Sequence, residues 1–243
     1  MPTRPAWCAL HTSDRGRSEA PEMTPQIAVV DYGMGNRRSV EKALERVGAR
    51  AFMSRDHAEL RAADGLLLPG VGAFPAAMAT IRELGLDGVL RERAAAGTPL
   101  FGSCMGMQLL FERSEEHGGA EGLGILRGEV RRLLADASSP PGLKLPHIGW
   151  SEVRWRRRSP LSEGLPEPAF LYHVHSFVAH PADPEVVLGT AEYGERFPAV
   201  IEHGNVYGAQ SHPEKSSTHG LRLLGNFVGI CAAAAAARIP LAS

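Results

Sequence analysis

Residues 101–107 read FGSCMGM, with Cys104 placed between Gly102 and Gly106. The apolar residues before the cysteine are typical of a buried strand, and paired glycines around a nucleophilic side chain are typical of a sharp strand-to-helix turn. Such a turn holds the side chain above the sheet, at the positive end of the helix dipole, where a thiolate is favoured. A lone cysteine on an apolar strand is more often a buried hydrophobe, so the glycines are what make Cys104 a candidate nucleophile.

Apolar strands and amphipathic helices alternate on either side of this turn. We expect strands at residues 27–30, 66–68 and 98–102, and helices over residues 40–47 and 75–96, the second broken near residues 85–88. This alternation implies parallel strands joined by right-handed crossovers. We therefore predict a flavodoxin-like α/β fold, an open mixed sheet with helices on both faces. Its chemistry is expected beyond the carboxyl ends of the strands.

After about residue 124 the pattern changes to strands and turns, and a helix follows. The strands are expected at residues 146–155, 170–179, 186–193, 199–203 and 206–210, and the helix at residues 220–238. Residues 1–22 are polar, contain proline and lack an apolar core, so we expect a disordered tail there. Residues 23–243 are predicted to form a single domain.

Composition excludes several classes of protein. The 26 Lys and Arg residues nearly balance the 27 Asp and Glu residues, whereas nucleic-acid binding needs a clear excess of positive charge. The basic run at residues 154–158 is therefore interpreted as a solvated loop or strand edge. The apolar stretch at residues 227–237 is shorter than the roughly 20 residues of a membrane span, so we expect no membrane association. Three cysteines, Cys8, Cys104 and Cys231, favour a reducing compartment, and the cytoplasm is expected.

A thiolate nucleophile needs a histidine that holds its proton, and that histidine needs an acceptor that orients it. His212 is the best local candidate, because it follows a predicted strand and is separated from Glu214 only by Pro213. The proline stiffens the turn and keeps imidazole and carboxylate within reach of each other. Taken alone, the segment is also typical of an exposed loop histidine beside a capping glutamate.

Three further histidines, His147, His173 and His175, are interpreted as structural because their spacing is not typical of metal ligands. We expect neither a metal nor another cofactor.

The segments G-x-C-x-G at residues 102–106 and H-P-E at residues 212–214 resemble those of class I glutamine amidotransferases. The match is closer to the glutaminase subunits of imidazole glycerol phosphate synthase and covers about residues 27–228. Six segments in the family's order carry it: residues 31–36 (DYGMGN), 69–74 (PGVGAF), 104–108 (CMGMQ), 146–150 (PHIGW), 172–177 (YHVHSF) and 212–216 (HPEKS).

The resemblance implies a glutaminase in which Cys104 is the nucleophile, His212 the base and then the acid, and Glu214 the carboxylate that orients His212. Glutamine would form a γ-glutamyl thioester, release ammonia and be hydrolysed to glutamate. The resemblance also implies a set of residues that bind glutamine or stabilise the oxyanion. They are Gly70, Val71, Gly72, Met105, Gln108, Ser176 and Phe177.

The resembled family passes ammonia to a (β/α)₈ cyclase subunit in histidine biosynthesis. We therefore expect a heterodimer, with Asn36, Trp150 and Lys215 at the interface. Two alternatives stay open: a glutaminase subunit of another synthase, such as that making pyridoxal phosphate or anthranilate, and a catalytically silent scaffold. Assays of glutamate release with each partner separate them.

The sequence departs from the family pattern without removing a catalytic group. The departures are Arg37, Ser103, Met105, Ser151, Phe177 and Ser211.

Overall fold

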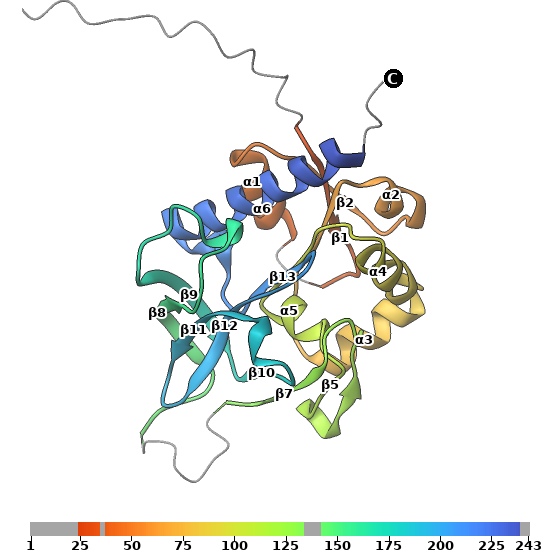
Figure 1. The fold of residues 1–243 in the computed structure, drawn as a ribbon. Helices are drawn as coiled ribbons and strands as arrows, with labels where there is room; N and C mark the ends of the chain where they lie inside the picture. Colours follow the sequence, from red (N-terminus) through yellow and green to blue (C-terminus); the bar gives the residue numbers. More distant parts are fainter. Residues whose placement is uncertain (1–23, 35–36, 134–141, 239–243) are drawn as a thin grey trace, which may run out of the picture.

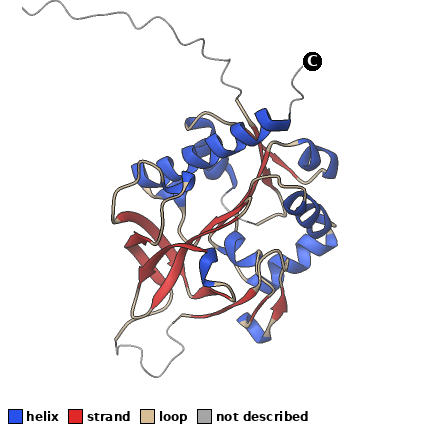
Figure 2. Cartoon of the chain, viewed as in Figure 1, coloured by secondary structure: helices blue, strands red, loops and turns tan. Residues whose placement is uncertain are grey.

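The computed structural model describes residues 24–34, 37–133 and 142–238. The predicted tail at residues 1–22 and the predicted interface residue Asn36 therefore lie outside the described residues. Helices and strands alternate along the first half of the chain, and strands dominate most of the second (Figures 1 and 2).

The described residues form a mixed main sheet of nine strands in the order β2-β1-β3-β4-β13-β12-β11-β8-β9. The strands from β2 to β13 are mutually parallel, and the remaining neighbours pair antiparallel. Its strands are β1 (Gln26–Val30), β2 (Arg50–Ser54), β3 (Gly65–Leu68), β4 (Leu100–Ser103), β8 (His147–Trp155), β9 (Ala169–His175), β11 (Val187–Glu192), β12 (Arg196–His203) and β13 (Val206–Ala209).

Helices cover both faces of the parallel half. They are α1 (Arg37–Arg46), α2 (His57–Ala62), α3 (Phe74–Glu83), α4 (Leu86–Ala95), α5 (Met105–Leu109) and α6 (Ser217–Arg238). Successive strand residues point to opposite faces, so Val29 and Leu67 join one apolar cluster with α1 and α6. Val30 and Leu68 join a second cluster with α2, α3, α4 and α5. The predicted architecture is confirmed.

The long second helix expected from the sequence is two helices, as the glycines in its middle suggested. α3 ends at Glu83 and α4 begins at Leu86. Gly85 between them has a φ of 65°, in the left-handed region that favours glycine.

A second, four-stranded sheet among the described residues was not anticipated. Its order is β10-β7-β5-β6, from β5 (Arg113–Ser114), β6 (Ala120–Glu121), β7 (Gly128–Arg132) and β10 (Phe177–Pro181). The prediction of one strand over residues 170–179 was therefore wrong, because the chain leaves the main sheet at Ser176. β9 pairs with β8, whereas β10 pairs with β7, and the carbonyl of Ser176 accepts from the N–H of Leu133.

The edge strand β2 and the short helix α2 were also missed. β2 has only one buried residue, Ser54, so it lacks an apolar pattern. α2 spans six residues, too few for periodicity, and is defined by its N-cap instead. The carboxylate of Asp56 accepts from the N–H groups of Ala58 and Glu59.

Helix α6 is long and apolar enough to cross a membrane by length and composition alone. However, Leu223, Leu224, Phe227 and Cys231 are buried, and they pack in the cluster beneath α1. In Figure 1 the helix lies along the sheet beside α1. One face of α6 therefore packs against the core formed with the main sheet.

Candidate active site

The turn between β4 and α5 carries Cys104 in a strained conformation. Cys104 has a φ of 54°, which non-glycine residues rarely adopt, and its N–H donates to the carbonyl of Ala209 at 2.8 Å. The flanking glycines are required by close packing. A Cβ on Gly102 would lie 2.6 Å from the carbonyl oxygen of Gly106, and a Cβ on Gly106 would overlap the carbonyl oxygen of Leu68. The predicted elbow is confirmed.

β13 runs parallel to β4 and brings the second motif to the same edge of the sheet. His212 follows β13, and Glu214 lies in the one-turn helix η4 (Pro213–Lys215). The Nδ1 atom of His212 lies 3.0 Å from Oε1 of Glu214, and both side chains are almost wholly buried. The alternative of an exposed loop histidine is therefore wrong.

Charge around His212 favours the imidazolium. Burial by itself lowers the pKa of His212, but hydrogen bonds to Cys104 and Glu214 outweigh burial and raise the pKa to about 10. Because Glu214 accepts at Nδ1, Nε2 is the nitrogen left to serve Cys104. A protonated histidine beside the sulfur is the arrangement that keeps a cysteine ready to attack a carbonyl carbon.

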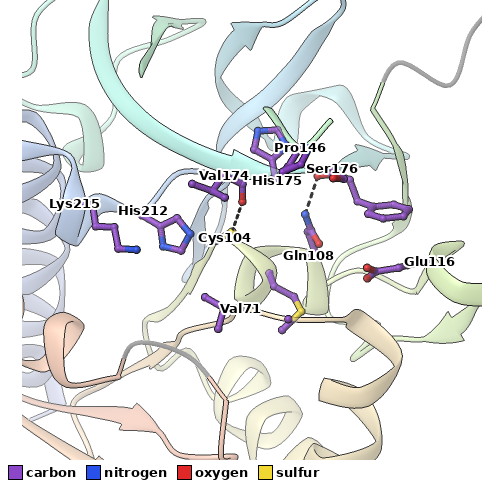
Figure 3. A pocket seen from close by; sticks show the side chains of 13 residues that line it. Val71, Cys104, Gln108, Glu116, Pro146, Val174, His175, Ser176, His212 and Lys215 are labelled. Carbon is purple, nitrogen blue, oxygen red and sulfur yellow. Dashed lines mark hydrogen bonds between the residues drawn. The ribbon is translucent and has the colours of Figure 1, made fainter. Parts of the chain in front are cut away.

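A cavity of about 310 Å³ opens above Cys104 (Figure 3). Its lining residues come mainly from α5, β9, β10 and η4 and from the turns that follow β3 and β4, so segments distant in sequence meet there. The residues of the predicted site that line it are Val71, Gly72, Cys104, Met105, Gln108, Ser176, Phe177, His212 and Lys215.

Among the described residues, three members of the predicted site do not line the cavity. Glu214 lies behind His212, with a side chain that is 2% exposed. Gly70 lies beneath the turn, where a Cβ would come 2.5 Å from the nitrogen of Gly106. Trp150 is half-exposed on β8 and is not among the residues that line the cavity.

Glu116 lines the cavity and was not predicted from the sequence. It begins the single-turn helix η1 (Glu116–Gly118), and its Oε2 accepts from the N–H of Phe74 at 2.8 Å. In Figure 3 its carboxylate faces Gln108 across the cavity. No signal near Glu116 distinguishes it from Glu115, since only the tertiary fold turns one of the two inward.

The loop at residues 70–73 is anchored by side chains at both ends. The hydroxyl of Tyr32 donates to the carbonyl of Pro69 at 2.6 Å, and Glu116 accepts from Phe74. Tyr32 is fully buried, and burial raises its pKa, with a further rise from the nearby Cys104. Between these anchors Val71 is 40% exposed and Gly72 has a φ of 102°.

The histidines interpreted as structural are buried together under the β8-β9 pair. His147 Nδ1 lies 3.2 Å from His175 Nε2, and His173 stacks on His147. Burial lowers the pKa of His173 to about 3 and that of His175 to about 2. Among the described residues no group of His, Cys, Asp or Glu side chains could hold a metal ion. His175 also lines the cavity, which the sequence did not indicate.

The model of the family "Glutamine amidotransferase class-I" matches residues 28–230. The chain belongs to the class I glutamine amidotransferases. As an amidotransferase of this class it is a glutamine-hydrolysing enzyme, which confirms the predicted activity. The matched region contains both the elbow at residues 102–106 and the His-Pro-Glu segment at residues 212–214.

Three proteins similar to this amidotransferase share the name "Imidazole glycerol phosphate synthase subunit HisH". The protein of Bacillus cereus (strain G9842) is 48% identical over 215 residues, which cover 88% of this chain and 100% of the relative. That of Moorella thermoacetica is 50% identical over 201 residues, covering 83% and 93%. That of Aquifex aeolicus is 50% identical over 203 residues, covering 83% and 95%. The resemblance drawn from the six segments is confirmed.

Solved structures with a similar fold are known. A glutamine amidotransferase crystal structure has a TM-score of 0.64 at 24% identity and covers 84% of this chain and 98% of its own. PurLQS from Thermotoga maritima has a TM-score of 0.65 at 20% identity and covers 86% and 99%. At these identities the likeness establishes the fold alone.

Proposed function

We propose that this amidotransferase releases ammonia from glutamine with Cys104, His212 and Glu214 and delivers it to a (β/α)₈ cyclase subunit. Imidazole glycerol phosphate synthase is the proposed assembly, and histidine biosynthesis the pathway. The observation that carries the proposal is the meeting of a strained cysteine and a carboxylate-bound histidine in one cavity.

The first half of the reaction uses the charges already present. The Cys104 thiolate attacks the side-chain amide carbon of glutamine, and the carbonyl π electrons move to oxygen. His212 then gives its proton to the leaving nitrogen, the C–N bond breaks, and ammonia departs from a γ-glutamyl thioester. Glu214 keeps the imidazole oriented and stabilises its positive charge throughout.

The second half returns the enzyme to its starting state. Neutral His212 takes a proton from water, and the resulting hydroxide attacks the thioester carbon. The C–S bond breaks, glutamate leaves, and Cys104 is again paired with a protonated histidine.

Backbone N–H groups are the proposed oxyanion donors. The N–H of Met105 starts helix α5, where the first amides lack an intrahelical acceptor. The loop at Gly70 and Val71 supplies the second donor, and its glycines permit two orientations of the peptide. One oxyanion donor is typically worth roughly 10²–10³ in rate, so this loop sets the activity.

Glu116 and Gln108 are the proposed contacts to the rest of glutamine. A carboxylate on the cavity wall suits the α-ammonium group, with which it forms a charge-assisted hydrogen bond. The Gln108 amide nitrogen donates to the carbonyl of Phe177 at 2.8 Å, which leaves its oxygen to accept from the substrate. Figure 3 shows that oxygen turned away from the bonded carbonyl.

The outer face of β8 and β9 is the proposed cyclase surface. Ile148 is 61% exposed, Trp150 52% and Phe170 43%, although all three are large and apolar. Trp150 pairs across the strands with Tyr172, and their rings lie 5.9 Å apart. An aromatic centre within an exposed apolar patch is typical of a protein interface. Lys215, on the cavity wall, is the proposed charged anchor beside this surface.

The same strand links that surface to the catalytic residues. The carbonyl of Tyr172 accepts from the N–H of His212 at 2.9 Å, and the carbonyl of Val174 lies 3.7 Å from the sulfur of Cys104. A cyclase that shifts β9 therefore acts on both halves of the catalytic pair. We infer that the isolated chain is a poor glutaminase and that the ligand-bound cyclase activates it, to the extent that the cyclase binds the competent arrangement more tightly.

The test is steady-state glutamate production by the chain alone, with apo cyclase, and with cyclase plus a substrate or product analogue. We expect low, intermediate and high rates in that order. Equal rates in all three conditions would contradict the coupling. Activation only by a pyridoxal phosphate or anthranilate synthase partner would move the assignment to that synthase.

The cytoplasm is the proposed location.

A further inference from the structure

Gln210 is fully buried behind Cys104 and has no part in the chemistry described so far. It follows β13 and precedes His212 by two residues, but it does not line the cavity. A buried amide needs partners for both its ends, because leaving a polar group unbonded inside a protein is costly. The partners that Gln210 has are Gln108 and the sulfur of Cys104.

The orientation of both amides follows from one carbonyl. The oxygen of Phe177 can only accept, so the Gln108 atom that lies 2.8 Å from it is the nitrogen. That same nitrogen lies 3.1 Å from the terminal atom of Gln210, which must therefore be the oxygen. The nitrogen of Gln210 is left facing Cys104 Sγ, at 3.9 Å.

The sulfur of Cys104 thus has one neighbour that favours the thiol and another that favours the thiolate. The carbonyl of Val174 at 3.7 Å accepts from a thiol and repels a thiolate, whereas the Gln210 amide donates to a thiolate (Figure 3 draws the Val174 contact). A hydrogen bond to the charged form of a group favours that form. Protonated His212 acts in the same direction as Gln210.

We propose that Gln210 is a positioning residue that holds Cys104 in its thiolate form, with its amide orientation set by Gln108 and the Phe177 carbonyl. This inference deepens the proposed function and rests on Cys104 being its nucleophile. Gln108 then has two roles, because the amide that faces glutamine in the cavity also fixes the amide behind the nucleophile.

Other titratable groups surround the sulfur and stay unchanged in the variants below. His212 and Tyr32 are close enough for the charge of Cys104 to affect their pKa values. Glu214 lies behind His212, while Glu116, His175 and Lys215 occupy the cavity wall.

The experiment measures the rate of Cys104 alkylation by iodoacetamide between pH 4 and pH 10, on the whole chain without partner or glutamine. Gln210→Met keeps the length of the side chain and removes the donor. The midpoint is the pH at which the alkylation rate reaches half its maximum. In Gln210→Met this midpoint is expected to rise by about one pH unit, which corresponds to about a tenfold loss of thiolate at any pH below the midpoint. Gln210→Glu keeps the acceptor for Gln108 and places an anionic oxygen by the sulfur, so its midpoint should rise further.

Ser211→Ala is the matched control. Ser211 is equally buried and adjacent in sequence, and its hydroxyl has no hydrogen-bond partner among the described residues. Its alkylation midpoint is expected to equal that of the wild type. Cys104→Ala reports any labelling at the other two cysteines, Cys8 and the buried Cys231, and circular dichroism verifies the fold of each variant.

If the Gln210 variants fold and their alkylation midpoints equal that of the wild type, the proposal is overturned. If neither variant folds, Gln108→Met takes their place, because it releases the Gln210 amide without touching the sulfur. A smaller rise of its midpoint supports the proposal, and an unchanged midpoint overturns it. Alkylation needs no glutaminase activity, so a chain that shows these shifts but releases no glutamate with any cyclase would refute the proposed function alone.

Discussion

Cys104 combines a backbone conformation that side chains avoid with neighbours that leave it no alternative. Its φ of 54° is maintained by the hydrogen bond from its own N–H to Ala209 and by glycines packed on both sides. Strain of this kind persists only where the surrounding structure over-determines it. The energy that folds the domain is thereby used to hold one sulfur above the sheet.

Replacing Cys104 by alanine should remove glutaminase activity, by roughly 10⁴-fold or more, because no other group can form the thioester. Synthesis by the complex from added ammonia should continue, since that chemistry belongs to the partner. The measurement is glutamate release beside ammonia-dependent product formation. A glutamine-like electrophile should label Cys104 and leave Cys8 and Cys231 unlabelled, because neither is flanked by the paired glycines of an elbow. Near wild-type hydrolysis by the alanine variant would remove Cys104 from the mechanism.

Glu116→Gln tests the carboxylate that the sequence did not reveal. If Glu116 binds the α-ammonium of glutamine, the KM for glutamine should rise about 10- to 100-fold with a smaller change in kcat, as expected for loss of one charge-assisted hydrogen bond. Glu115→Gln is the control, because Glu115 is exposed and accepts from the backbone of Arg132 instead. An unchanged KM in Glu116→Gln would show that the ammonium group binds elsewhere.

At the scale of elements, helix α5 and strand β3 are in unusually close contact. A Cβ on Gly106 would overlap the carbonyl oxygen of Leu68, so no side chain fits between the helix and the strand end. The close approach places the first turn of α5 beside the loop that starts at Gly70, where the two proposed oxyanion donors must converge.

Gly106→Ala should therefore lower the free energy of unfolding by about 1–3 kcal/mol or more, the usual effect of overpacking a core. Gly229→Ala in α6 is the matched control, because nothing lies near its added methyl group. There alanine should stabilise by about 0.5–1 kcal/mol through its higher helix propensity. Urea unfolding of both variants makes the comparison. Equal stability of Gly106→Ala and the wild type would contradict the packing described.

Strand β9 carries the two histidines whose pKa values are lowest. The unfolded chain binds protons at His173 and His175 near pH 6.5, but the folded chain does so only near pH 3 and pH 2. Their neutral burial therefore contributes stability that is present above pH 6.5 and is lost as the pH falls toward 3. The loss is about 1.4 kcal/mol per pH unit for each histidine.

His173→Phe should make this acid dependence less steep by about 1.4 kcal/mol per pH unit, because one titrating group is removed. It also removes a buried ring nitrogen that has no partner among the described residues. The free energy of unfolding in urea between pH 4 and pH 7 is the measurement. Substituting the exposed His203 by asparagine should leave the slope as in the wild type. A slope unchanged in His173→Phe would show that His173 is protonated in the fold.

Across the whole molecule, the nine-stranded sheet places the proposed catalytic residues and the proposed partner surface in different halves. The parallel half carries the strand-to-helix turn of Cys104, and the antiparallel half ends in the apolar face of β8 and β9. The catalytic cavity lies between them. A partner that covers this face therefore contacts the same strand that touches Cys104 and His212.

Trp150→Ala should weaken cyclase binding by at least about 30-fold, the effect expected of an aromatic anchor at the centre of an interface. Met53→Ala is the control, because Met53 is 42% exposed but lies on β2, at the opposite edge of the main sheet. Titration calorimetry with the cyclase measures both affinities. Equal affinities for Trp150→Ala and the wild type would remove this face from the interface.

Local sequence patterns predicted the helices and strands that are marked by apolar periodicity or by a glycine within a few residues. The alternation of apolar strands and helices predicted the parallel half of the sheet, and the glycine near residue 85 predicted the break between α3 and α4. The elbow at Cys104 and the pairing of His212 with Glu214 also followed from local sequence, because each depends on residues two positions apart. Short or edge elements such as α2 and β2 escaped, since six or fewer residues carry too little periodicity.

The chain's amino-acid order was sufficient to predict the fold class and to propose the nucleophile and its base, because strand period, glycine geometry and the stiff His-Pro-Glu turn are local properties. Pairing partners were not local. Three features depend on the tertiary structure. The chain passes from β9 in one sheet to β10 in the other at Ser176, Glu116 lines the cavity, and Gln210 is buried behind the sulfur of Cys104. Contacts across more than 100 residues, such as that between Gln108 and Gln210, depend on how the whole sheet is ordered, and no short segment encodes that order.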